Sequence, residues 1–186
     1  MTGEVPVLET ERLRLRPFRH SDLEPHAATL ADPEVVRHLS GTPHSREESW
    51  RRMLCAPGLW ALLGYGYWAV ERRVDGAWLG QVGFADFKRD MMPSIEGLPE
   101  MGWIFAPHAQ GQGFAGEAVA AALAWADRAL APAEIVAIIS HGNAPSIRVA
   151  ERAGFAERSE ARYRDEPILL FRRRRPDEPA GASARD

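Results

Sequence analysis

The chain has 186 residues, of which 45% are hydrophobic and 26% are charged, and its formal net charge is −3 at pH 7. This composition is typical of one folded domain with a sizeable core, and the small acidic excess gives no general attraction to nucleic acid. The single cysteine excludes an internal disulfide, and no apolar stretch approaches the length of a membrane span. We therefore expect a cytoplasmic domain over residues 1–175 and a disordered polar tail over residues 176–186.

The first half of the chain mixes short strands and helices. Residues 12–16 alternate arginine with leucine, as a half-buried strand does. Residues 21–24 and 45–48 both match the capping box, in which a serine and a glutamate three positions later satisfy the first helical amides, so each predicts a helix start. The elements expected next are two strands and a loop, over 65–72, 78–88 and 89–98.

The second half alternates strands with helices. The expected elements are a strand over 100–106, a helix from Gly113 with an apolar stripe, a strand over 134–140, a helix over 145–153, and strands over 155–163 and 167–173. This order favours parallel strands in the second half, whereas the first half favours antiparallel strands. Together the two halves predict a mixed α+β sheet.

The most informative segment is a glycine-rich turn that leads into a helix. Such a turn presents unpaired backbone amides at the positive end of the helix dipole, which is a site for a phosphate-bearing ligand. The residues expected to bind it are Phe105, Gln110, Gly111, Gln112, Gly113, Phe114, Ala115 and Gly116. The three glycines also match the G-x-G-x-x-G of dinucleotide sites, but the preceding strand ends too early for that fingerprint.

The same segment resembles a different cofactor loop. Gln110-x-x-Gly113-x-Ala115 resembles the pyrophosphate loop of the GNAT superfamily of N-acetyltransferases. Further segments resemble its RimJ/RimL-like branch, which acetylates protein N-termini and related amines: Glu100-x-Gly102-Trp103, residues 113–118, residues 143–155 and residues 8–17. The resemblance implies a single domain with a strongly twisted mixed sheet of about six to seven strands and helices on both faces. It also implies transfer of an acetyl group from acetyl-CoA to a primary amine.

Direct attack on a thioester requires an amine that has lost its extra proton. A peptide α-amine has a pKa near ~7.8, so freeing it at pH 7 costs about 1 kcal/mol, whereas a lysine near ~10.4 costs about 4.6 kcal/mol. One carboxylate acting through water suffices for an α-amine, and we expect Glu100 to be this base. Its alternative role is an ion pair at the strand edge. Asp86, Asp90 and Glu96 lie in neighbouring segments and either make the acceptor end acidic or form a solvated rim.

Two polar residues match positions that contact the pantetheine arm and lie near the sulfur in the family, namely Asn143 and Ser146. Capping of the helix N-terminus is their alternative role. Many superfamily members have a tyrosine seven residues after the asparagine, where this chain has Ala150. The resemblance therefore leaves the Ser146 hydroxyl as the acid for the leaving thiolate, with Tyr163 as a more distant alternative.

Two other functions stay open at this level. A non-catalytic acyl-CoA-binding protein is compatible with Ala150, and an NAD-dependent oxidoreductase is compatible with the three glycines. The scattered histidines and the single cysteine predict no metal site. The expected partner is the acceptor amine, on a protein or peptide N-terminus or on a small molecule. We expect no nucleic acid or membrane partner, and a homodimer is left open.

Overall fold

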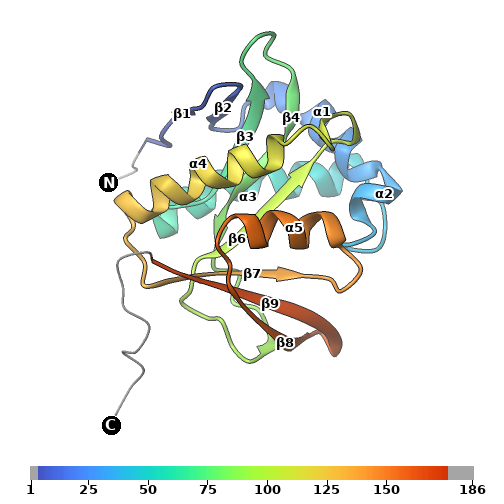
Figure 1. Cartoon of the computed structure of the whole chain (residues 1–186). Coiled ribbons are helices and arrows are strands. Elements are labelled where there is room, and N and C mark those ends of the chain that lie inside the picture. Colours follow the sequence, from blue (N-terminus) through green and yellow to red (C-terminus); the bar gives the residue numbers. More distant parts are fainter. Residues whose placement is uncertain (1–3, 176–186) are drawn as a thin grey trace.

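The computed structural model describes residues 4–175, which form one nine-stranded sheet with helices on both faces (Figure 1). The strands are β1 (Leu8–Glu9), β2 (Leu13–Arg16), β3 (Tyr67–Arg72), β4 (Trp78–Ala85), β5 (Met91–Met92), β6 (Glu100–Phe105), β7 (Glu134–Ile139), β8 (Glu157–Tyr163) and β9 (Glu166–Arg174). The helices are η1 (His20–Asp22), α1 (Leu23–Ala31), α2 (Pro33–Val36), α3 (Arg46–Leu63), η2 (Pro107–Ala109), α4 (Phe114–Ala129) and α5 (Ala144–Arg152). The tail predicted over 176–186 lies outside the described residues.

The α+β fold with one mixed sheet is confirmed, but the predicted strand number is too low. The sheet runs in the order β1-β2-β3-β4-β6-β7-β9-β8-β5, with nine strands in place of about six to seven. Two of the strands, β1 and β5, have only two residues each, which is too short to show an alternating pattern. The loop predicted over 89–98 contains β5, which pairs with the far end of β8.

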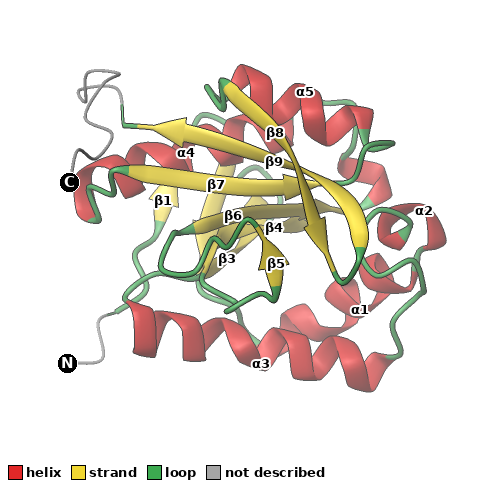
Figure 2. Ribbon diagram, turned by 90° about the horizontal axis from the view of Figure 1, so that it is seen from below, coloured by secondary structure: helices red, strands yellow, loops and turns green. Residues whose placement is uncertain are grey.

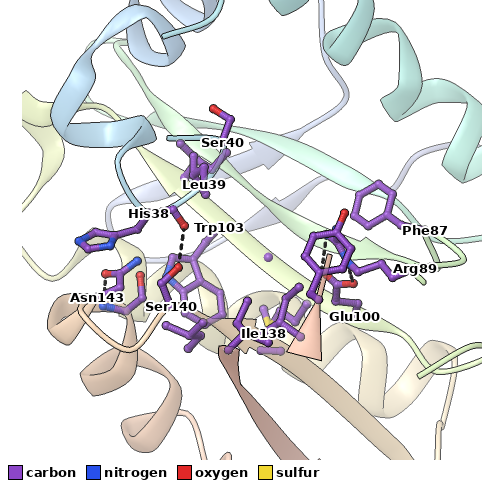
Figure 3. Close-up of a pocket in the computed structure, with 18 of the residues that line it drawn as sticks. His38, Leu39, Ser40, Phe87, Arg89, Glu100, Trp103, Ile138, Ser140 and Asn143 are labelled. Carbon is purple, nitrogen blue, oxygen red and sulfur yellow. Dashed lines mark hydrogen bonds and ion pairs between the residues drawn. The ribbon is translucent and has the colours of Figure 1, made fainter. Parts of the chain in front are cut away.

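The prediction of parallel strands in the second half is confirmed for β6 and β7 but for no other pair of the described strands. Among the described strands, only β6 and β7 form a parallel pair, and they are in register only at Glu100 and Val136. Beyond this pair both strands line a pocket (Figure 3). After β7 the chain forms α5 and then β8, which is separated from β7 in the sheet by β9. A hairpin joins β8 to β9, and β9 pairs antiparallel with both β8 and β7.

Helices cover both faces of the sheet, as Figure 2 shows, with α1, α2 and α3 on one side and α4 and α5 on the other. All eight residues of β4 are buried, because this central strand is covered on both faces. Alanines and valine on α4 let the helix approach the sheet closely, and Trp68 on β3 packs against Trp125 on α4 at 5.1 Å between ring centroids. The strands that hold the pocket are therefore anchored in a well-packed core.

One of the two predicted capping boxes forms. At the start of α3, Ser45 and Glu48 satisfy each other's backbone amides, as expected. The box predicted over residues 21–24 does not form, because Ser21 lies inside η1 and the Glu24 carboxylate binds Arg46 at 2.6 Å. The Asp22 carboxylate instead accepts the Arg19 amide at the start of η1, at 2.7 Å, and also binds the buried Arg16.

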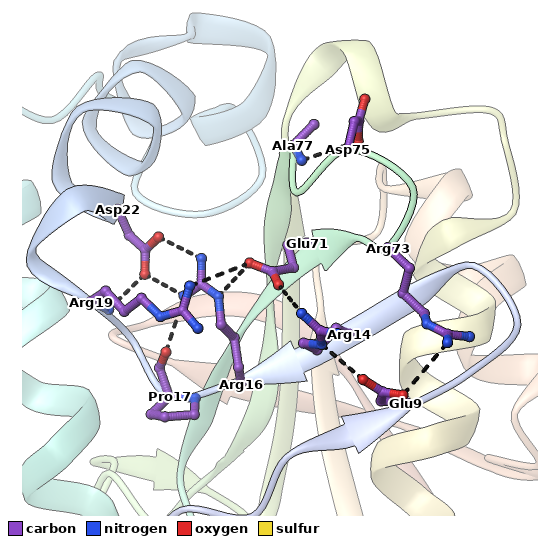
Figure 4. Close-up of polar contacts among 10 residues, drawn as sticks. All are labelled: Glu9, Arg14, Arg16, Pro17, Arg19, Asp22, Glu71, Arg73, Asp75 and Ala77. Carbon is purple, nitrogen blue, oxygen red and sulfur yellow. Dashed lines mark hydrogen bonds and ion pairs between the residues drawn. The ribbon is translucent and has the colours of Figure 1, made fainter.

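The ion pair between Asp22 and Arg16 is part of a buried charge network between the first strand and the sheet (Figure 4). The Arg16 guanidinium donates to both oxygens of Asp22, at 2.7 and 2.8 Å, and to Glu71 at 2.5 Å. All three side chains are buried, and Arg14 also donates to Glu71. Arg16 therefore joins β2, η1 and β3 and neutralises two carboxylates that water does not reach.

Replacing Arg16 with methionine should destabilise the fold strongly. Arg16→Met keeps most of the side-chain volume but leaves Asp22 buried without its cation and removes the shortest ion pair of Glu71, a loss of about 3–5 kcal/mol in the free energy of unfolding. Urea unfolding measures this change. Arg37→Met removes a solvent-exposed ion pair with Glu34 and serves as the control, for which we expect little change. Equal losses in the two variants would contradict the assignment.

A second buried ionisable group lies in α1. His26 is 1% exposed, and its ring packs edge-on against Phe18 and Trp78 at centroid distances of 5.8 Å. Its Nε2 atom has no hydrogen-bond partner among the described residues. Burial in this apolar site, reinforced by the nearby Arg52 charge, lowers the pKa of His26 to about 4.

This lowered pKa makes the stability of the fold depend on pH. Between about pH 4 and 6.5 the unfolded histidine binds a proton and the folded one does not, so stability is lost as the pH falls through this window. The loss amounts to about 3 kcal/mol at most. We expect His26→Phe to flatten the wild-type slope in urea unfolding from pH 7 to 4, since other acidic groups titrate equally in both proteins. Parallel slopes in the two proteins would show that His26 is not responsible.

Candidate active site

The candidate site is a gap between the two parallel strands of the sheet. The amide of Val136 on β7 donates to the Pro99 carbonyl oxygen at 3.0 Å, and beyond this point the two strands have no registered pair. Residues 101–104 of β6 and 137–139 of β7 line a cavity of about 640 Å³. This volume is in the range of small-molecule sites. The cavity therefore exists because a sheet that is continuous elsewhere opens at this position.

The cavity has two chemically different ends, shown in Figure 3. Asn143 and Ser140 lie at one end, and Phe87, Arg89 and Glu100 lie at the other, with Ile138 between them. The remaining lining residues are His38, Leu39, Ser40, His44, Arg52, Tyr67, Lys88, Asp90, Trp103, Ser146, Tyr163, Arg164 and Ile168, together with the strand residues above. One end is thus polar and next to a helix start, and the other is aromatic and charged.

The glycine-rich turn lies outside the cavity, between η2 and α4. Gly111 and Gly113 have φ angles of 73° and 79°, which favour glycine, and Gly113 is the N-cap of α4. The amides of residues 111–116 donate to no other described residue. Neither Phe105 nor residues 110–116 line the cavity. Residues 111–116 therefore form a separate patch of free amides at a helix N-terminus.

Topology brings this patch to the same edge of the sheet as the polar end of the cavity. Because β6 and β7 are parallel, their carboxyl ends lie at one edge, and each leads into a helix, α4 after β6 and α5 after β7. Figure 1 shows both helices starting on that side. Two positive helix ends therefore flank the gap.

Side chains that the sequence analysis did not single out bind the glycine turn and the first turn of α4. Arg12 donates to Glu117 at 2.7 Å and to the Gln112 carbonyl oxygen at 3.0 Å, and the Thr10 hydroxyl donates to Glu117 at 2.6 Å. Arg12 and Glu117 both belong to segments that resemble the family, but they are more than a hundred positions apart. Only the fold shows that they meet.

Asn143 and Ser146 lie together at the start of α5. The Asn143 side-chain oxygen accepts the Ser146 amide at 3.2 Å, so Asn143 caps the helix as well as lining the cavity. Ser146 lines the same cavity. Ala150 is fully buried in the main core and lies outside the lining, so position 150 contributes no group to the site.

Glu100 lies in the cavity wall with an arginine that sequence reasoning did not single out. The Arg89 guanidinium donates to both Glu100 oxygens, at 2.6 and 2.8 Å, and Glu100 is 4% exposed. The guanidinium also lies 4.8 Å from the ring centroids of Phe87 and Tyr163, in cation–π contact with both. The ion-pair alternative raised for Glu100 is thus present, and the carboxylate still lines the cavity.

Tyr67 presents a phenol to the same region. Its ring is buried on β3, and its hydroxyl approaches Gly102 so closely that a Cβ at position 102 would lie 2.4 Å from the oxygen. Burial, together with the Glu100 charge, raises the pKa of Tyr67 to about 12. The phenol therefore stays protonated, and Gly102 is the residue that makes room for it.

The acidic acceptor end that the sequence suggested does not form. Asp86 and Glu96 lie outside the cavity lining and both bind Lys88, at 2.7 and 3.4 Å. Of the three acids, only Asp90 lines the cavity. Within residues 4–175, no cluster of histidine, cysteine and acidic residues could hold a metal ion, and no helix is long and apolar enough to cross a membrane.

Comparisons with known proteins identify the family. A family model described as an acetyltransferase (GNAT) domain matches residues 12–156. A GNAT-family acetyltransferase structure from Bordetella pertussis is 30% identical, covers 91% of this chain and 99% of its own, and has a TM-score of 0.78. An acetyltransferase structure from Agrobacterium tumefaciens is 28% identical, covers 91% and 95% of the two chains, and has a TM-score of 0.77. The uncharacterized protein YkkB of Bacillus subtilis is 29% identical over 90% of this chain and 95% of its own.

More distant structures share the fold. A spermidine N-acetyltransferase from Vibrio cholerae in complex with CoA and spermine, and RimL in complex with CoA, are each 18% identical to this chain with TM-scores of 0.69. They cover 89% and 91% of it. The match of the family model over most of the chain, on a sheet that opens between β6 and β7, shows that this protein belongs to the GNAT family of acetyltransferases and is an enzyme of that class.

Proposed function

We propose that this chain is an acetyl-CoA-dependent N-acetyltransferase of the RimJ/RimL-like type, which transfers the acetyl group to a primary amine by direct attack. The observation that carries the proposal is the gap between β6 and β7, which opens beside the free amides at the start of α4. The resemblance of the glycine turn and of residues 143–155 to the RimJ/RimL-like branch supports the finer assignment.

The residues present fit CoA by their chemistry. The amides of residues 111–116 have no partner among the described residues, and they lie at a helix N-terminus, where a pyrophosphate is stabilised. The facing edges of β6 and β7 lack ladder bonds to each other past Glu100, so they can pair with the amides of a pantetheine arm as a strand edge pairs with a peptide. Asn143 would meet this arm at the start of α5.

Two residues of the chain are assigned the proton transfers of the reaction, Glu100 from the amine and Ser146 to the leaving sulfur. When bound, acetyl-CoA supplies the thioester carbonyl that the amine attacks. An ionised carboxylate has about four acceptor sites, and Arg89 occupies one on each Glu100 oxygen, so Glu100 can still accept a proton from the amine through water. We assign to the Ser146 hydroxyl, on the α5 side of the cavity, the proton for the leaving sulfur, and the second proton that the amine nitrogen loses on forming the amide restores this hydroxyl through water.

One observation favours a second function, that of a non-catalytic acyl-CoA-binding protein. Ala150 is buried in the core, so the helix position that carries a phenol in many relatives offers no acid to the cavity. Binding of CoA without turnover of any amine would support this second function.

The cofactor assignment predicts ligand-dependent stabilisation. A ligand at 100 times its dissociation constant stabilises by about 2.7 kcal/mol, or roughly 5–10 °C for a domain of this size. We expect this shift in thermal unfolding with acetyl-CoA and with CoA, but not with NAD. Gly113→Ala strains a residue with φ of 79° inside the amide patch and should diminish the shift, whereas Gly76→Ala, at φ of 70° in the β3–β4 turn, should retain it. A shift with NAD alone would contradict the assignment.

Glu100 as base predicts a difference between two variants of one ion pair. Glu100→Gln removes the proton acceptor, so we expect turnover to fall by about 10²-fold. Arg89→Gln removes the partner but keeps the carboxylate, so turnover should fall much less than in Glu100→Gln. Steady-state rates from pH 6 to 9, with folding checked by circular dichroism, give the comparison. Equal losses in both variants would mean that the ion pair is only structural.

A further inference from the structure

The cavity lining carries more positive than negative charge, because its charged residues are Arg52, Lys88, Arg89 and Arg164, against Asp90 and Glu100. The end that holds Arg89 is aromatic, because Phe87 and Tyr163 stack on its guanidinium (Figure 3). If CoA occupies the end beside the two helix starts, as the proposed function has it, these residues are left to contact the acceptor.

Two of the four cations already have carboxylate partners within the chain. Arg89 is paired with Glu100, and Lys88 with Asp86 and Glu96. These pairs engage both cations within the protein, and the two carboxylates that bind Lys88 lie outside the cavity lining.

The other two cations have no carboxylate within ion-pair distance among residues 4–175. Arg52 follows Glu48 by one helical turn on α3, where such a pair is usual, but Glu48 instead caps the helix at Ser45. Arg164 lies in the β8–β9 turn with its guanidinium 5.1 Å from the Tyr163 ring centroid. Asp90 is the one lining carboxylate without an ion pair in the described part of the chain. The uncompensated charges of this end are therefore two cations and one anion.

We infer that the acceptor is a small amine that also carries a carboxylate, of the amino-acid type, and not a polycation; this inference rests on the proposed function. The carboxylate of such a zwitterion complements Arg52 and Arg164, and its amine complements the two lining carboxylates, Asp90 and Glu100, the second of which is the proposed base. A polyamine would meet two like charges for each acidic group, which disfavours its binding. Phe87 and Tyr163 give an apolar surface for the rest of the molecule.

The test compares acceptors that differ only in the carboxylate. Release of free thiol from acetyl-CoA is measured with amino acids, with the corresponding amino-acid amides, with short peptides that have an acidic or an amidated second residue, and with spermidine. We expect amino acids to have the highest kcat/KM and the amides at least about tenfold less. The KM of the carboxylate acceptor should rise with ionic strength, because exposed charge pairs are screened by salt. An acceptor carboxylate can belong to a free amino acid or to an acidic peptide. A higher kcat/KM for free amino acids than for acidic peptides would identify the free amino acid as the acceptor.

Variants that remove one positive charge show which arginines bind the acceptor carboxylate. Arg52→Ala and Arg164→Ala should each raise the KM of the carboxylate acceptor about fivefold, the upper range for a solvent-exposed pair, and leave the KM of the amide unchanged. The matched controls are Arg51→Ala, on the same helix but paired with Glu47, and Arg158→Ala, on the same hairpin but outside the cavity. Both controls should behave as wild type.

The outcomes separate this inference from the proposed function. Turnover that favours the amides or spermidine overturns the inference and leaves N-acetyltransferase activity standing. Absence of turnover with every amine overturns the proposed activity, and thermal unfolding with CoA then decides the inference. Additional stabilisation by amino acids or their N-acetyl products, but not by the amides, supports it, and no difference between them overturns it.

Discussion

The structure depends on the early separation of two parallel strands. β6 and β7 are in register at one position, Glu100 and Val136. A cavity of about 640 Å³ lies where further residues of the two strands would otherwise pair. Unpaired backbone groups inside a protein are costly, so such a gap persists only where the flanking strands are held firmly. Here β4 pairs with the other edge of β6, and β9 with the other edge of β7. The site is therefore a defect in a sheet that is anchored on both sides.

Arginine–carboxylate pairs fix the surroundings of this gap. Arg12 holds the glycine turn through Glu117, Arg16 ties the first strand and η1 to the sheet, and Arg89 positions Glu100 in the cavity wall. Each pair joins segments that are separate in the chain, and two of them are largely removed from water. Buried pairs of this kind contribute through the cost of leaving either partner alone. The charges that remain unpaired in the cavity are consequently the ones available to a ligand.

The glycine turn and the cavity have separate parts in the site. The turn offers backbone amides and the positive end of α4, which suits a pyrophosphate and requires no particular side chain. The cavity offers side chains from five or more separate segments, and its aromatic and charged end differs from its polar end. A chain can therefore keep the first feature and vary the second, which is consistent with a family whose relatives act on different amines.

The sequence by itself determined the features of this protein that depend on short stretches of neighbouring residues. The glycine turn before α4, the Ser45 capping box, the strands from β2 to β9 other than β5, and the family were all readable, because each rests on residues close in the chain. Tertiary structure alone decided that β6 and β7 part after one pair, that Asp22 binds Arg16, and that Arg89 binds Glu100. It also gave the acceptor end its cations. These contacts join distant segments, and charge pairing between such segments leaves no periodic signal in a single sequence.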